Sequence, residues 1–108
     1  MDAIRETLYC RVTYTYEANG LTHLAEGWMR DFSTTECGIR GRLLPPLGSA
    51  TAVTLYLRDG DPPVSFHGSV SWIAVGCFGV VIREVHDTDF MRIQRYLLDL
   101  HYVTMTVW

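Results

Sequence analysis

A polar segment from Arg30 to Gly41 concentrates the side chains that are best suited to bind a ligand. The side chains of Asp31 and Ser33 compete for backbone hydrogen bonds, so Asp31-Phe32-Ser33 is expected to form a turn rather than continue a strand. Turns of this composition often only connect strands, but a turn held by a rigid sheet can also form a binding site. Asp31 can accept hydrogen bonds from the N–H groups of guanine, and Ser33 can both donate and accept them.

Arginines lie before and around this turn. Arg11 belongs to a strand-like run and Arg5 precedes that run, while Arg30 and Arg40 flank the turn. A guanidinium is a planar fork of donors that suits phosphate oxygens and the acceptor edge of guanine, and it also stacks on bases. On residue type alone, Arg5 and Arg11 are better read as solvated charges at a strand edge. A binding site at these arginines therefore needs further support.

The sequence contains no recognisable catalytic or metal-binding pattern. A serine or cysteine nucleophile needs a base and an orienting group, and no glycine-flanked serine, phosphate-cradling glycine loop or His-Glu-x-x-His helix is present. The three cysteines, Cys10, Cys37 and Cys77, are widely spaced, which is typical of reduced thiols rather than of zinc ligands. We therefore expect a protein without catalytic residues, metal or cofactor.

The composition is that of one globular domain. The 108 residues are 48% hydrophobic and 19% charged, and the net charge is −3. Such a chain can bury its own core, and its charge gives no general attraction to nucleic acid or to an anionic membrane. No apolar run is long enough to span a bilayer, and the first residues lack the pattern of a secretion signal. We expect a cytoplasmic protein with neither nucleic acid nor a membrane as partner.

The pattern of apolar residues predicts about six strands. Val12, Tyr14 and Tyr16 alternate with polar residues, which is the two-residue period of a strand. Asn19-Gly20 is a strong hairpin signal. The next run, with Leu24 and Trp28 as bulky members, is a second strand, and a proline pair ends the third. The predicted strands are 8–16, 21–29, 37–44, 51–58, 64–73 and 78–85. Their spacing and turns favour a mainly β fold, an antiparallel barrel or sandwich spanning residues 8–86.

The period changes near residue 88. Phe90, Ile93, Leu97 and Leu100 recur at helical spacing, which predicts an amphipathic helix over 88–101 capped by Asp87 or Thr88. Its apolar side is expected to pack on the barrel or on a partner protein. Residues 102–108 alternate apolar residues with threonine and read as a strand-like tail. Because an exposed strand edge recruits other chains, we expect this tail to make the protein self-associate as a homo-oligomer.

The segment Asp31-Phe32-Ser33-Thr34-Thr35-Glu36-Cys37-Gly38-Ile39 resembles the Asp/Asn-x-Ser-x-x-Gly turn of PilZ domains, which are bacterial receptors for the second messenger cyclic di-GMP. The resemblance continues through Leu55-Tyr56-Leu57, Gly68-Ser69-Val70-Ser71-Trp72, Phe78-Gly79-Val80 and the helical segment that starts at Asp89. It covers about residues 8–101. It implies a single domain over 1–108, folded as a six-stranded antiparallel barrel with a C-terminal helix.

The family's ligand site combines an Arg-x-x-x-Arg segment with this turn. The resemblance therefore implies that Arg11, Asp31 and Ser33 bind cyclic di-GMP. Four positions before Arg11 the sequence has Thr7, so Arg5 is the nearest substitute for the other arginine, and Glu36 replaces the glycine of the turn. Both departures weaken the expected site, because one guanidinium is missing and a carboxylate is added beside a dianionic ligand.

Two functions remain open from the sequence. The first is a non-enzymatic signalling protein that binds cyclic di-GMP, or another nucleotide in its place, with reduced affinity. The second is an adaptor that has lost the ligand and acts through protein contacts. Its contact surface would be the helix over 88–101 or the tail over 102–108.

Overall fold

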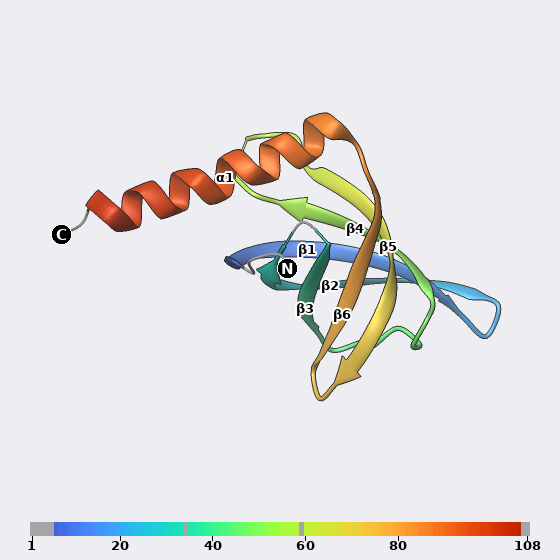
Figure 1. Cartoon of the computed structure of the whole chain (residues 1–108). Coiled ribbons are helices and arrows are strands. Elements are labelled where there is room, and N and C mark those ends of the chain that lie inside the picture. The colour runs from blue at the N-terminus through green and yellow to red at the C-terminus, as the bar shows by residue number, and fades with distance from the viewer. Residues whose placement is uncertain (1–5, 34, 59, 107–108) are drawn as a thin grey trace.

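The chain folds into a closed six-stranded antiparallel barrel with one C-terminal helix (Figure 1). The structure is a computed structural model that describes residues 6–33, 35–58 and 60–106, with side chains described from residue 10 to residue 99. Around the barrel the strands follow the order β1-β2-β3-β6-β5-β4. The elements are β1 (Glu6–Ala18), β2 (Leu21–Phe32), β3 (Glu36–Gly41), β4 (Ala50–Tyr56), β5 (Val64–Ala74), β6 (Cys77–Val85) and α1 (Asp87–Thr106). The predicted fold class is confirmed.

The two-residue period sorts each strand into an inner and an outer face. Val12, Tyr14 and Tyr16 of β1 are buried inside the barrel, while Arg11 is exposed on its surface. On β2 the inward residues are Ala25 and Met29, and the bulky residues that we named in this strand, Leu24 and Trp28, face solvent. The outer surface of β2 therefore carries large apolar side chains that the core does not use.

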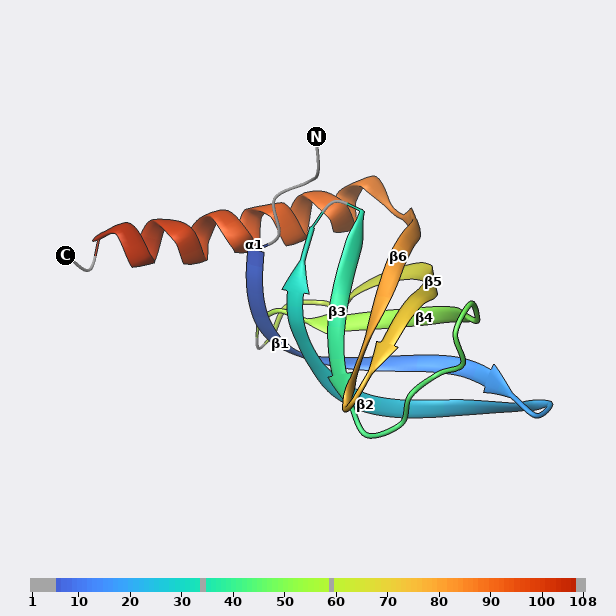
Figure 2. The same cartoon turned by 60° about the horizontal axis from the view of Figure 1, so that its bottom comes forward.

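The first hairpin forms where the sequence predicts it. Asn19 and Gly20 have φ angles of 55° and 76°, the left-handed conformation that this pair of residues tolerates at a tight hairpin turn. The paired strands β1 and β2 are long, and their turn projects beyond the barrel on the side away from the C-terminus (Figure 2). The other ends of these two strands, near α1, contain the candidate ligand residues.

Tyr14 lies in the interior of the barrel with 0% of its surface exposed. Its hydroxyl donates a hydrogen bond to the carbonyl oxygen of Leu43 at 2.6 Å. Its ring meets Phe78 edge-on, with the centroids 4.9 Å apart. A Cβ atom at Gly41 would collide with the Tyr14 hydroxyl, so this glycine makes room for the tyrosine. The ring thus joins β1, β6 and the segment after β3.

The helix packs on the barrel through its predicted apolar side. Ile93 is fully buried in the core, and Tyr96 and Leu97 pack partly against it. The N-terminus is capped by His86 rather than by Asp87 or Thr88. The His86 carbonyl accepts from the Phe90 N–H at 2.9 Å, and its ring nitrogen accepts from the Thr88 N–H at 3.4 Å. The far half of α1 projects past the barrel in both views (Figures 1 and 2).

The tail prediction is wrong over the residues that the structure describes. Residues 102–106 continue α1 to Thr106 instead of forming a strand, and residues 107–108 lie outside the described part of the chain. The six strands already close into a barrel, so the sheet offers no free edge to a seventh strand. The described residues therefore do not form the C-terminal strand through which we expected the protein to self-associate.

Two strands end three residues away from their predicted ends, and the other strand boundaries differ from prediction by at most two residues. Strand β2 continues through Asp31 and Phe32, which we expected in the turn, because both remain paired with β1 and β3 around an irregularity between Met29 and Asp31. Strand β3 ends at Gly41 rather than at Leu44, since the chain there turns to cover the Tyr14 hydroxyl. Asp31 is consequently presented by a strand rather than by a loop.

Candidate functional site

Arg11 lies on the outer face of β1. In register it stands opposite Trp28 of β2 and Tyr56 of β4. Its guanidinium carbon is 4.3 Å from the centre of the Tyr56 ring, and its Nη1 atom is 3.4 Å from the Glu26 carboxylate. Both ion-pair partners are largely exposed, so this contact is worth at most about 1 kcal/mol. Arg11 can leave it for a stronger anionic partner at small cost.

Asp31 lies on the same outer face, further along β2. It is paired in register with Gly38 of β3 and with Thr7 of β1. A Cβ atom at Gly38 would lie 3.0 Å from the Asp31 Oδ1 atom, so the glycine leaves space that the carboxylate occupies. The Arg30 Nε atom is 3.9 Å from Asp31 Oδ2, and 23% of the Asp31 side-chain surface is exposed. The carboxylate is therefore accessible at the surface of the sheet.

Ser33 organises the β2–β3 turn from inside. It is 5% exposed. Its hydroxyl donates to the Glu36 carbonyl at 3.0 Å and accepts from the N–H groups of Thr35 and Glu36 at 3.3 and 3.1 Å. The Ser33 N–H also donates to the Glu36 carbonyl, at 2.8 Å. In this conformation the hydroxyl is engaged by the turn itself, so Ser33 determines where the backbone of the turn lies.

Glu36 is held by an indole. The Glu36 Oε1 atom accepts a hydrogen bond from Trp72 Nε1 at 2.8 Å. Trp72 of β5 stands opposite Gly79 of β6, and its ring covers this glycine, because a Cβ atom at Gly79 would overlap the indole. Gly79 in turn pairs with Gly38. The carboxylate that we expected to oppose the ligand is thus bound to a tryptophan of β5, and strands β3 and β6 lie between β5 and the strand of Asp31.

The structure therefore brings some of the predicted site residues together, and other predicted site residues lie outside its described part. Arg11 and Asp31 share one outer face on adjacent strands, and Ser33 shapes the turn that follows Asp31. Arg5 lies outside the described residues, and the backbone of Thr7 is described without its side chain. The contributions of Arg5 and Thr7 to a site remain predictions.

Sequence reasoning missed the aromatic residues near this site. Trp28 lies between Arg11 and Arg40 in register, and Trp72 lies across from Gly79. One signal was available, since an aromatic side chain in one strand can cover a glycine in the neighbouring strand. The pairing of Trp28 with two arginines depends on strand register, which the sequence pattern did not supply.

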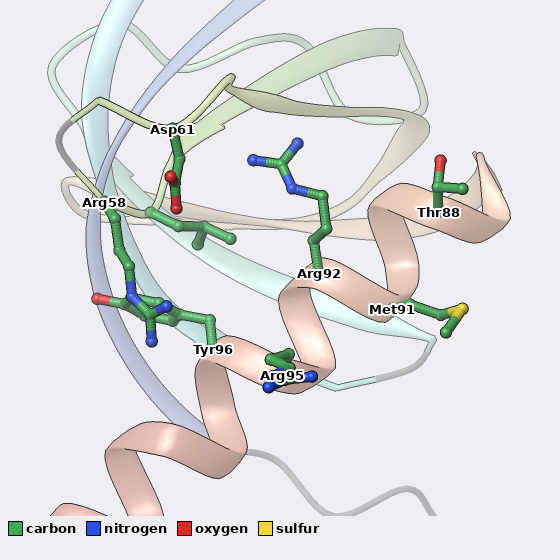
Figure 3. Close-up of a pocket in the computed structure, with 8 residues that line it drawn as sticks. Arg58, Asp61, Thr88, Met91, Arg92, Arg95 and Tyr96 are labelled. Atoms are coloured by element: carbon green, nitrogen blue, oxygen red, sulfur yellow. The ribbon is translucent and has the colours of Figure 1, made fainter.

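A second concentration of arginines lies in a groove of about 420 Å³ between α1 and the β4–β5 connection (Figure 3). Arg58 is 2.5 Å from the Asp99 carboxylate and lies over the Tyr96 ring, with 5.3 Å from its guanidinium carbon to the ring centre. Arg92 is 3.7 Å from Asp89 and donates to the Pro62 carbonyl. These contacts hold the helix against the barrel, so the main role of the groove residues is to attach α1 to the β4–β5 connection.

Two other kinds of site have no support in the described part of the chain. No group of three or more His, Cys, Asp or Glu side chains is arranged there to hold a metal ion. Among the described helices, none combines the length and apolar character needed to cross a bilayer.

The buried thiol of Cys10 has a pKa raised to about 12 by burial, so it stays protonated at neutral pH.

Comparison with known proteins agrees with this arrangement. The family model of the PilZ domain matches residues 3–99, which include all six strands and most of α1. No curated protein matches the chain. PilZ domains form a receptor family for cyclic di-GMP and are in general binding domains rather than enzymes. The match extends over nearly the whole barrel and its helix, and the chain belongs to the PilZ domain family.

Proposed function

We propose that this PilZ domain binds cyclic di-GMP on the outer face of β1 and β2, beside the β2–β3 turn, and acts as a non-enzymatic signalling receptor. The observation that carries the proposal is the placement of Arg11 and Asp31 on one exposed face of adjacent strands. The guanidinium can donate hydrogen bonds to a phosphate, and the carboxylate can accept hydrogen bonds from the guanine N–H groups of the same ligand.

Each residue has a distinct role in this proposal. Arg11, with help from Arg5, binds phosphate and the acceptor edge of guanine, and Asp31 accepts from the guanine N–H groups. Ser33 holds the turn through its hydrogen bonds to the backbone of Glu36, and so fixes the position of the turn that follows Asp31. Arg11 must turn away from Tyr56 and Glu26 to reach the ligand.

Titration calorimetry with cyclic di-GMP tests the proposal. At a protein concentration of about 100 µM, binding with a Kd in the micromolar range produces measurable heat. Arg11→Ala is expected to weaken binding roughly tenfold to hundredfold, because a good bidentate arginine contact is worth about 1–3 kcal/mol. Cyclic di-AMP should bind more weakly, since adenine lacks the N1–H donor that Asp31 would accept.

Arg95→Ala provides a matched control, because it removes the same charge from an exposed position on α1. Its affinity should equal that of the wild type. No heat from the wild-type protein would reject the receptor function. If Arg11→Ala binds as well as the wild type, the ligand lies elsewhere on the domain.

Glu36 is expected to lower the affinity of this site through its charge. Glu36→Gln keeps an oxygen that can accept from Trp72 Nε1 but removes the negative charge near a dianionic ligand. We expect cyclic di-GMP to bind about threefold to tenfold more tightly to this variant at low salt, as a charge interaction of about 1 kcal/mol implies. Calorimetry at two salt concentrations checks this, and an unchanged affinity would show that the Glu36 charge does not reach the ligand.

The second candidate function is an adaptor that works through protein contacts alone. The observation that favours it is on α1, where Met91 and Leu98 are 65% and 68% exposed. Exposed apolar residues on a helix whose other side is buried can bind a partner protein. Calorimetry separates the two functions, because an adaptor that works through protein contacts alone should give no binding heat with cyclic di-GMP.

A further inference from the structure

The side chain of Trp28 lies outside the hydrophobic core of the barrel. It lies on β2, a strand paired on both sides, and its side chain points outward with 55% of its surface exposed. The neighbouring inward residue, Met29, fills the core instead. Because the core does not use this indole, its face is available for contact with another molecule, a common role of tryptophan at binding surfaces.

The surroundings of Trp28 are basic. In register, Arg11 of β1 lies on one side of Trp28 and Arg40 of β3 lies on the other. A hollow of about 540 Å³ beside the indole is lined by Arg11, Arg40 and Arg42, and Glu26 is the one acid among its described lining residues. The whole chain carries a net charge of −3, so this positive charge is a local feature of the face.

The cations of this face differ from those of the helix groove. Arg58 and Arg92 in the groove are ion-paired with Asp99 and Asp89. Across the described residues, neither Arg40 nor Arg42 forms an ion pair or a side-chain hydrogen bond. Both residues are exposed. They therefore have donors available for an anion that comes from outside the chain.

The dimensions of the face suit a base with a phosphate. Neighbouring strands lie about 4.8 Å apart, so Arg11 and Arg40 start about 10 Å from each other across Trp28. A second hollow of about 440 Å³ is also lined by Trp28, together with Arg11, Tyr56, Arg58 and Asp61 among others. Hollows of 300–1,000 Å³ are the usual size for small-ligand sites. A planar base can lie on the indole with arginine forks at its two edges.

We propose that Trp28 is a stacking platform for a guanine base and that Arg40 and Arg42 bind the phosphate next to that base. This proposal rests on the proposed function, and it extends the site from Arg11 and Asp31 across β2 to β3. The ligand class is a guanine nucleotide with at least one phosphodiester, such as the second half of cyclic di-GMP. Stacking of a base on an aromatic side chain typically contributes roughly fivefold to hundredfold in affinity.

Tryptophan fluorescence and calorimetry with cyclic di-GMP test this inference on the full chain. Ligand should quench the fluorescence of the wild type, and Trp28→Phe should lose this quenching while its Kd stays within about threefold, because a phenyl ring still stacks. Trp28→Ala should bind roughly fivefold to hundredfold more weakly. The double variant Arg40→Ala/Arg42→Ala should bind more weakly and show a smaller dependence on salt, since phosphate contacts account for that dependence.

Leu24→Ala is the matched control, because Leu24 is an exposed apolar residue on the outer face of the same strand, 68% exposed. It should leave both affinity and quenching unchanged. Circular dichroism confirms that each variant is folded. If the wild type binds and Trp28→Ala binds equally well without altered quenching, the platform is wrong while the receptor function stands. If the wild type gives no heat, both proposals fail together.

Discussion

Tyr14→Ala is expected to lower the free energy of unfolding by about 3–5 kcal/mol, the usual cost of truncating a large buried aromatic residue. Tyr14 is fully buried, meets Phe78 edge-on at 4.9 Å and donates to the Leu43 carbonyl at 2.6 Å. Its loss leaves a cavity in the barrel and removes the hydrogen bond that holds the segment after β3. Because small domains are stable by about 5–15 kcal/mol in total, this variant should be partly unfolded at moderate temperature.

Tyr14→Phe separates the hydroxyl from the ring. It keeps the aromatic packing but leaves the Leu43 carbonyl without its donor, so it should cost about 1–2 kcal/mol. Urea denaturation followed by circular dichroism measures both variants against the wild type. A loss below about 1 kcal/mol for Tyr14→Ala would mean that the barrel closes around the cavity, and the ring would then not be the centre of the core.

Gly79→Ala is expected to displace Trp72 from the outer face of the barrel. A methyl group at this position overlaps the indole, whose nitrogen donates to the Glu36 carboxylate at 2.8 Å. Overpacking of this kind typically costs about 1–3 kcal/mol. Loss of the hydrogen bond and exposure of the indole should add to that cost and shift the tryptophan emission to longer wavelength.

A double-mutant cycle with Trp72→Ala isolates the contact. In the Trp72→Ala background the added methyl group has no indole to meet, so Gly79→Ala should cost less than about 1 kcal/mol there. Unfolding free energies of the wild type, the two single variants and the double variant complete the cycle. Equal costs in the two backgrounds would show that Gly79 is required for a reason other than Trp72.

The local pattern of the sequence was sufficient to predict the strands, the helix and the fold class. The alternation of Val12, Tyr14 and Tyr16 with polar residues predicted a strand with one buried face, and burial in the structure follows that alternation. Asn19-Gly20 predicted the hairpin through its tolerance of positive φ. The helical spacing that includes Ile93 predicted the helix and the side of it that enters the core.

Register could not be read from the same pattern. An irregularity in β2 next to Arg30 keeps Asp31 paired with Gly38, although the residue types favour a turn. Serine is a residue type common in exposed turns, yet the Ser33 hydroxyl is turned inward and hydrogen-bonds the backbone of Glu36. Such shifts depend on how a strand is accommodated between two neighbours, which a single-strand period does not describe.

By itself the sequence determined the period of each segment, and with it the strands, the first hairpin and the core side of the helix. Only the tertiary structure decided which side chains became neighbours, such as Glu36 with Trp72, and Trp28 with Arg11 and Arg40. It also decided that residues 102–106 continue a helix. The physical reason is the same in both cases. Closing six strands into a barrel brings distant residues into register and leaves no free edge for another strand.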